Sequence, residues 1–343
     1  MIIPDVPMGN NRQNHTMKKI ILLVVALMFS AATFAQQQLA TLNHQNHTTA
    51  YYGADALISA HAAAENGDII TLSPGVFNAT NISKAVTIRG AGAWADTTGG
   101  STMIRNNFNI NIARDNTYHL TMEGINAYNN IQCDNAYNAQ FIKCNFQWIG
   151  VPGSSNASFV NCILWYWNTS SSGNTAGTQF TNSVVMDCNN HAVPDTYINC
   201  VVKQNPSQAS SRMFQNCVLY YNYTSGSTPS NNSTTSFNCL YVQMNADSNY
   251  TAKLYAPLAS HELWNERGMN TVFKTFNGSV GENFELLDSI ANTYRGNDGT
   301  QIGIYGGPMP FDPRVTNPLI KRINVADRSN SEDKLPVTIE MGE

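Results

Sequence analysis

The sequence predicts an all-β solenoid, and three observations lead to that fold class. A short motif with an aromatic residue and, three positions later, Cys or Ser recurs five times, and in most copies Asn precedes the Cys or Ser. Side chains around the motif alternate with a period of two, as in short strands. The intervals between copies are short and irregular. The five copies read FIKCNF, FVNCIL, FTNSVV, YINCVV and FQNCVL, beginning at Phe141, Phe159, Phe180, Tyr197 and Phe214.

The spacing of the motif indicates one coil of chain per copy. The Cys or Ser position falls at 144, 162, 183, 200 and 217, which gives intervals of 18, 21, 17 and 17 residues, and Cys239 follows after 22. These intervals are too short for propeller blades, and the leucine consensus of leucine-rich repeats is missing. If coils stack about 4.8 Å apart, equivalent residues lie above one another. We therefore expect ladders of aromatic rings, asparagines and thiols.

Each motif predicts two short strands joined by a turn. In FVNCIL, Phe159 and Val160 are expected on opposite faces, while Cys162 and Leu164 point inward and Ile163 outward. Asn tolerates a left-handed backbone better than other non-glycine residues. The turns are therefore assigned to the motif asparagines, which are Asn161, Asn182, Asn199 and Asn216.

Two further stretches resemble a known family. The segment ALISAHAAAENGDIITLSPGVFNATNISKAVTIRGAGAW, 56–94, is similar to the N-terminal part of right-handed parallel β-helix proteins of the pectin-lyase-like family. The segment FELLDSIANTYRGNDGTQIGIYGG resembles the closing segment of secreted bacterial β-helix proteins. The sequence departs from that closing pattern at Gln301 and at Ser289 and Ile290. The resemblance implies a right-handed β-helix over 50–311, on a scaffold that carries many functions.

The ends of the chain predict export and two small additions to the solenoid. Met17 begins a segment with Lys18, Lys19 and an apolar core before Ala35, which is typical of a secretory signal peptide. We read 1–16 as an extension from a wrong start, 17–35 as the signal peptide, and the mature protein as secreted or periplasmic without membrane insertion. A capping helix is expected over 54–65, and 312–343 is expected to form a linker and a short β-hairpin.

Charge and cysteines narrow the possible partners. The formal net charge is −4, and removal of Arg12, Lys18, Lys19 and Asp5 with the signal peptide changes it from 19 − 23 to 16 − 22, or −6. Nucleic acid is therefore an unsuitable partner.

The seven cysteines are interpreted mainly as stacked free thiols, with one or more disulfides as the alternative. Their spacing predicts no metal site. We expect a monomer.

Catalytic groups are sparse in the middle of the chain. Over 115–250, 136 residues, only nine positions are charged, and 144–186 carries none. The best constellation for acid and base chemistry is Asp187, Asp195, Lys203 and Arg212, with His191 between the carboxylates. The alternative for Asp187 and Lys203 is an ordinary surface ion pair. The resemblance implies no cofactor, except calcium if the protein is a lyase.

Aromatic residues at the strand ends suggest a binding surface. Rings beside amides and hydroxyls form a platform on which sugar rings stack. The alternative is that some rings turn inward to cover the corner between sheets. The candidate ligand-binding residues are Trp148, Trp165, Tyr166, Trp167, Tyr220, Tyr221 and Tyr223.

Three functions therefore compete. The first is a non-catalytic protein that binds a polysaccharide or another surface partner through its aromatic flank. The second is a divergent polysaccharide lyase or glycoside hydrolase, which the resemblance and the charged constellation allow. The third is a structural stalk or adhesin.

Overall fold

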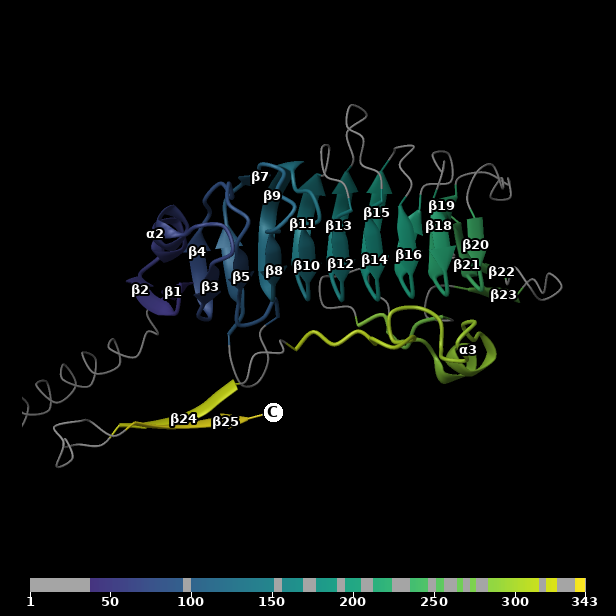
Figure 1. The fold of residues 1–343 in the computed structure, drawn as a ribbon. Helices are drawn as coiled ribbons and strands as arrows, with labels where there is room; N and C mark the ends of the chain where they lie inside the picture. Colours follow the sequence, from purple (N-terminus) through teal and green to yellow (C-terminus); the bar gives the residue numbers. More distant parts are fainter. Residues whose placement is uncertain are drawn as a thin grey trace, which may run out of the picture. The chain divides into compact units, whose positions relative to one another are not determined.

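Successive coils of the chain build two β-sheets that run side by side along a solenoid (Figure 1). From β8 to β21, each coil contributes one strand to each sheet, and neighbouring coils pair in parallel. The predicted all-β solenoid of parallel coils is confirmed. The structure is a computed structural model, and it describes residues 38–94, 100–150, 156–168, 177–189, 195–204, 212–223, 235–245, 251–255, 264–267, 272–275, 283–314, 319–325 and 337–342.

The first sheet has 11 strands, and most of them are only three or four residues long. In spatial order its strands are β2 (His47–Tyr52), β1 (Leu39–His44), β3 (Ile69–Leu72), β5 (Thr87–Arg89), β8 (Thr121–Glu123), β10 (Gln140–Ile142), β12 (Ser158–Val160), β14 (Gln179–Thr181), β16 (Thr196–Ile198), β18 (Met213–Gln215) and β20 (Thr235–Phe237).

The second sheet has 12 strands, of which 11 form one path and β7 lies off it. They are β4 (Gly75–Asn78), β6 (Thr102–Arg105), β9 (Ile125–Asn135), β11 (Asn145–Gly150), β13 (Ile163–Asn168), β15 (Val184–Asn189), β17 (Val201–Gln204), β19 (Val218–Tyr223), β21 (Leu240–Asn245), β22 (Thr251–Tyr255) and β23 (Trp264–Arg267), and β7 (Phe108–Asn111) pairs with β9. The last two strands of this path are antiparallel to their neighbours.

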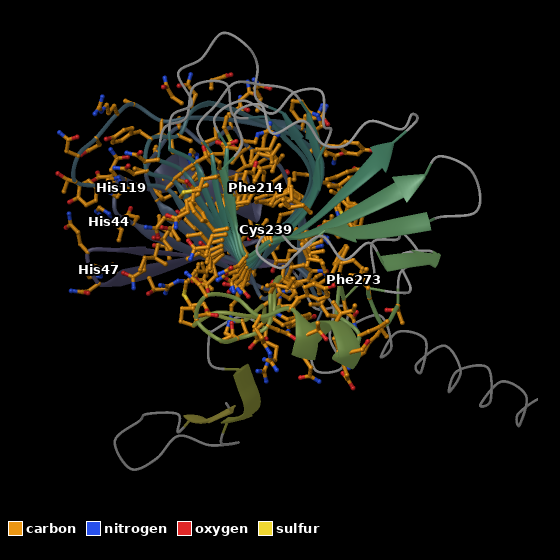
Figure 2. The ribbon with its side chains drawn as sticks, turned by 90° about the vertical axis from the view of Figure 1, so that its right-hand side faces the viewer. His44, His47, His119, Phe214, Cys239 and Phe273 are labelled. Atoms are coloured by element: carbon orange, nitrogen blue, oxygen red, sulfur yellow. The ribbon has the colours of Figure 1, made fainter. Side chains whose placement is uncertain are left out.

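Aromatic rings form a continuous stack inside the coils. The middle residue of each three-residue strand points inward, so that Phe141, Phe159, Phe180, Tyr197 and Phe214 lie above one another with at most 1% exposure. Neighbouring ring centroids are 4.7 to 5.0 Å apart, close to the strand spacing. Each stacked pair contributes about 0.5–1.5 kcal/mol beyond its buried area. Figure 2 shows Phe214 among these interior side chains.

The motif asparagines adopt the left-handed backbone that the sequence predicts. Asn161, Asn182, Asn199 and Asn216 have φ angles of 47 to 55°, and Asn238 has 49°. A left-handed residue turns the chain between the two strands of a coil at little cost when that residue is Asn. The column of asparagines therefore marks one edge shared by both sheets.

The predicted column of thiols is also present. Cys144, Cys162, Cys200, Cys217 and Cys239 follow the turn in successive coils, are at most 2% exposed and are free. Ser183 takes the same place in its coil and donates through Oγ to the carbonyl of Thr181 at 2.9 Å. The thiols pack as small apolar groups in the position expected of them. The side chain of Cys188 lies outside the described residues.

Ile163 points outward, as the alternation predicts, and it is nevertheless buried. It faces away from the coil interior but is only 3% exposed. The equivalent residues of the next coils are buried with it in a second apolar cluster, and Figure 2 labels Phe273 in this cluster. The cluster comprises Ile163, Val184, Val201, Val218, Leu240, Val272, Phe273, Phe284, Leu286, Ile290, Ile302 and Ile304. The end of the chain thus covers an apolar row on the outside of the solenoid.

Residues 297–314, here called the C-terminal strap, run along the asparagine turns in the reverse order of the coils. Asn216 Nδ2 donates to Asn297 Oδ1 at 2.9 Å, and the Asn216 carbonyl accepts from the Gly303 amide at 2.8 Å. Asn182 Nδ2 donates to the carbonyls of Ile304 and Gly306 at 2.8 and 2.7 Å. The turn residues therefore also hold the strap.

The rest of the strap follows the same edge. Asn161 Oδ1 accepts from the Asp312 amide at 2.6 Å, and Lys143 Nζ donates to the Arg314 carbonyl at 2.6 Å. Lys143 occupies the left-handed turn position of its coil, with φ 53°. Gly306 is required by this approach, because a Cβ there would lie 2.8 Å from Asn199 Nδ2 and would clash with the Gln301 carbonyl.

Short helices and hairpins complete the chain. Helix α2 (Ala56–Ala63) packs on β1 to β4 at the beginning of the solenoid, as the predicted capping helix should. Burial lowers the pKa of its His61 to about 4, with Lys84 adding to the effect.

Helix α3 (Asp288–Thr293) precedes the strap. The predicted C-terminal hairpin is present as β24 (Leu319–Val325) and β25 (Val337–Gly342). Residues 1–37, and with them the expected signal peptide, lie outside the described residues.

The thiol column should be chemically inert in the folded protein. Burial raises the pKa of the Cys144, Cys217 and Cys239 thiols, and thiolate is the reactive form. We expect iodoacetamide to leave these cysteines unlabelled in native protein and to label them fully in guanidinium, as mapped by mass spectrometry. Labelling of the native protein, or a disulfide between neighbouring rungs, would contradict the arrangement.

The asparagine turn should stabilise the fold through its side chain. Asn182→Gly keeps the left-handed backbone but leaves two buried strap carbonyls without their donor, and each unsatisfied group costs about 1–3 kcal/mol. The free energy of unfolding in urea should fall accordingly. Asn138→Gly is the matched control, because Asn138 also has a left-handed φ of 55° and makes no contact with the strap among the described residues. Equal stability of the two variants would refute the role.

Candidate functional site

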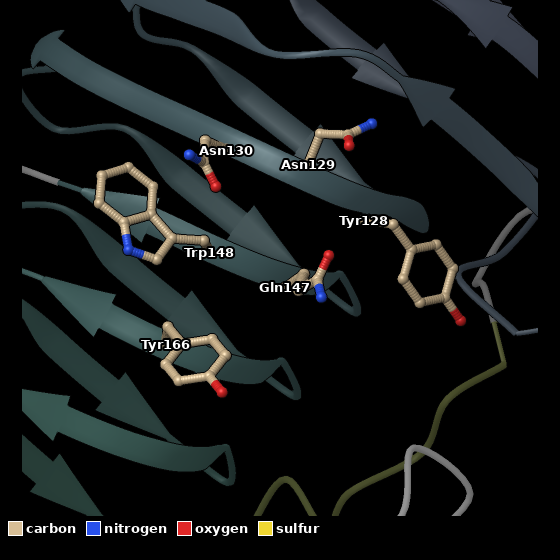
Figure 3. Close-up of a pocket in the computed structure, with 6 residues that line it drawn as sticks. All are labelled: Tyr128, Asn129, Asn130, Gln147, Trp148 and Tyr166. Carbon is tan, nitrogen blue, oxygen red and sulfur yellow. The ribbon is translucent and has the colours of Figure 1, made fainter.

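A shallow hollow lies on the outer face of the 12-stranded sheet (Figure 3). Its volume is about 330 Å³. Three neighbouring strands form it, and each contributes an aromatic ring. The lining residues are Tyr128, Asn129 and Asn130 of β9, Gln147 and Trp148 of β11, and Tyr166 of β13.

An irregularity in strand pairing produces the hollow. Between Phe146 and Trp148 the register of β9 against β11 shifts, because Ala127 pairs with Phe146 whereas Asn130 pairs with Trp148. Two residues of β9, Tyr128 and Asn129, therefore stand opposite the single residue Gln147. An extra residue of this kind bends its strand and redirects side chains. The bulge explains why adjacent residues of β9 can both line the hollow.

The rings sit on a rigid base. Ala127, Phe146 and Ile149 are at most 1% exposed and hold β9 and β11 to the interior. Trp148 is half-buried, and its six-membered ring lies over Gly150, where a Cβ would be 2.8 Å from the ring. The glycine at position 150 thus makes room for the indole.

The two tyrosines of the hollow are open to solvent. Tyr166 is 48% exposed and Tyr128 is 39% exposed. Trp148 pairs directly with Tyr166 on the next strand. The backbones of the two residues are therefore one strand spacing apart, roughly 4.8 Å. Large exposed rings at fixed spacing present flat apolar surfaces to a ligand.

The polar groups of the hollow are neutral. Asn129, Asn130 and Gln147 each offer an amide donor and an amide acceptor, and the tyrosine hydroxyls can do both. None of the six lining residues carries a charge near neutral pH. The hollow can therefore stack an apolar face and hydrogen-bond hydroxyl groups. Among its six lining residues there is no carboxylate, imidazole, amine or guanidinium, and the tyrosine hydroxyls are their ionisable groups.

Of the predicted aromatic residues, Trp148 and Tyr166 come together in the hollow and Trp165 does not. Trp165 packs beside the second apolar cluster, and its Nε1 donates to Asn145 Oδ1 at 3.0 Å. Tyr128 was missed by the sequence analysis. Its coil has neither the aromatic residue nor the Cys of the motif, and its only signal was an aromatic residue among asparagines.

The remaining aromatic candidates have described backbones only. Trp167 lies in β13 and pairs with Ile149, and Tyr220 of β19 pairs with Lys203. Tyr221 and Tyr223 lie in the same strand as Tyr220. The side chains of these four residues are outside the described part of the structure, so their binding role stays a prediction.

Two of the four catalytic candidates lie inside the solenoid. Thr196 pairs with Met213, which places the preceding residues, Asp195 and Arg212, at equivalent points of adjacent coils. Both are only 2% exposed. Tyr197 of the aromatic stack donates its hydroxyl to Asp195 Oδ2 at 3.5 Å. These opposite charges form part of a buried polar cluster, which a polymer on the outer surface does not touch.

The other two catalytic candidates are neighbours in the backbone. Val185 pairs with Val202 and Cys188 with Gln204, so Asp187 lies beside Lys203 on the adjacent strand. Lys203 is partly exposed. The side chain of Asp187 and the whole of His191 lie outside the described residues. A catalytic role for this pair therefore remains a prediction.

Within the described ranges, no cluster of three or more His, Cys, Asp or Glu side chains is suited to a metal ion. In the same part of the chain, no helix has the length and apolar character needed to cross a membrane. Comparisons with protein-family models, with curated proteins and with solved structures found no match for this chain.

Proposed function

We propose that this protein is an exported β-solenoid that binds carbohydrate without cleaving it, and that the hollow around Trp148 is its binding site. The observation that supports this most is the combination of three rings, Tyr128, Trp148 and Tyr166, with three amides on one outer face. Pyranose rings have apolar faces and hydroxyl edges, which match rings and amides respectively. The expected signal peptide over 17–35 supports export.

Binding is favoured over cleavage by where the charged residues lie. Lyases and hydrolases of polysaccharides need ionisable groups that converge on the substrate. The lining of the hollow has no carboxylate, imidazole, amine or guanidinium, and Asp195 and Arg212 are buried inside the coils. The hollow supports a binding function, and no comparable feature of the described residues supports a stalk or adhesin function.

Replacement of the rings tests the proposal. Trp148→Ala and Tyr166→Ala should each weaken binding to a neutral glycan by about two- to tenfold, because a stacked ring contributes roughly 0.5–1.5 kcal/mol. Binding would be found on a glycan array and quantified by titration calorimetry with the purified mature protein. Tyr52→Ala is the matched control, since Tyr52 is 63% exposed and lies far along the chain in β2.

Two results would overturn the proposal. One is the absence of binding to every glycan on the array. The other is binding that is equal in the wild type and in both hollow variants. Incubation with the bound glycan, followed by assays for new reducing ends and for unsaturated products, tests the non-catalytic part, and either product would favour the enzyme.

A further inference from the structure

We propose that the carbohydrate extends from the hollow along the solenoid onto a strip of exposed asparagines, so that the protein selects an extended neutral glycan and not a single terminal sugar. This inference rests on the proposed function. The amide strip consists of Asn81, Asn107, Asn109, Asn111, Asn130 and Asn135, all of which are exposed.

The strip and the hollow share one residue and one sheet. Asn130 lines the hollow, and its backbone amide donates to Asn107 Oδ1 at 3.1 Å, which joins the coil of β9 to the preceding one. Asn109 and Asn111 of β7 pair with Gln132 and Asn135 of β9. The sheet therefore continues the binding face from β13 through β11 and β9 to β7, a distance of roughly 14 Å at about 4.8 Å per strand.

The outward direction of the amides follows from the core. In β7, Phe108 and Ile110 are at most 3% exposed, and they alternate with Asn109 and Asn111. Because successive side chains of a strand point to opposite faces, the two asparagines face outward. The strand cannot rotate them inward without exposing Phe108 and Ile110.

Neighbouring coils hold the amides in place. Asn81 Oδ1 accepts from the Asn109 backbone amide at 3.0 Å, and Asn135 Nδ2 lies 3.5 Å from Asn111 Oδ1. Asn81 and Asn107 use their carbonyl oxygens in this way, and within the described residues their Nδ2 groups donate to no protein acceptor. Fixed donors that face solvent are positioned for sugar hydroxyls and lose little entropy on binding.

The strip and the hollow are themselves uncharged, which suits a neutral polymer. All six members of the strip are uncharged amides, and the six residues that line the hollow carry no carboxylate or cationic group. The exposed charges beside the strip have both signs, because Asp134 adjoins Asn135 whereas Arg105 and Arg114 lie close in sequence to Asn107 and Asn111. The amides and rings are therefore the groups that select the ligand.

The length dependence of binding tests this inference. Neutral oligosaccharides of glucose, mannose and xylose, from two to six units long, would be titrated into the mature protein. In the series that binds, the wild-type affinity should rise at least about tenfold, or about 1.4 kcal/mol, from the shortest to the longest member. Asn109→Ala/Asn135→Ala should bind the disaccharide as the wild type does and should lose that rise.

The controls separate this inference from the proposed function. Asn43→Ala, at an exposed position of β1, should behave as the wild type throughout, and circular dichroism would check that all variants are folded. Binding with no length dependence, or an unchanged rise in the double variant, would overturn the extended site and leave the hollow intact. Failure of every series to bind would overturn the proposed function and the extended site together.

Discussion

The left-handed asparagine turn is the element on which the rest of the molecule depends. A backbone with φ near +50° bends the chain sharply between two strands, and Asn accepts this conformation at little cost. The short side chain then remains at the edge of the coil, where it can donate and accept. In Asn161, Asn182 and Asn216 it does so with the C-terminal strap. One residue type therefore closes each coil and also holds the covering segment.

The chain that follows the coils covers an apolar row that the coils leave on their outer side. Residues directly after the thiol column point outward, and from Ile163 to Leu240 they are apolar. An exposed row of this kind on a sheet is prone to unwanted association. Residues 272–304 supply apolar partners such as Phe273 and Ile304, and the row becomes a second core outside the first. Since the strap occupies this edge of the solenoid, a ligand must use another surface.

The candidate site occupies a part of the solenoid where the repeat is imperfect. The coil of β9 lacks the motif, and its extra residue beside β11 brings Tyr128 and Asn129 to the same hollow. Regular coils stack similar residues, which stabilises the fold but leaves an even surface without a hollow. The bulge between β9 and β11 breaks this regularity at the hollow and redirects side chains, while the aromatic stack nearby keeps the base rigid. Shape and rigidity are both needed for recognition of a flexible polymer.

The sequence by itself determined the solenoid, because strand alternation, left-handed asparagines and stacked thiols are local or strictly repeated properties that act between nearest coils. It also indicated Trp148 and Tyr166 from their equivalent positions after the motif. Only the tertiary structure decided that Ile163 is covered, that Trp165 turns toward a different cluster, and that Asp195 and Arg212 lie inside. The cover over Ile163 depends on the C-terminal part of the chain, the position of Trp165 on its contact with Asn145, and the inward position of Asp195 on its contact with Tyr197. Periodicity carries no information about such contacts.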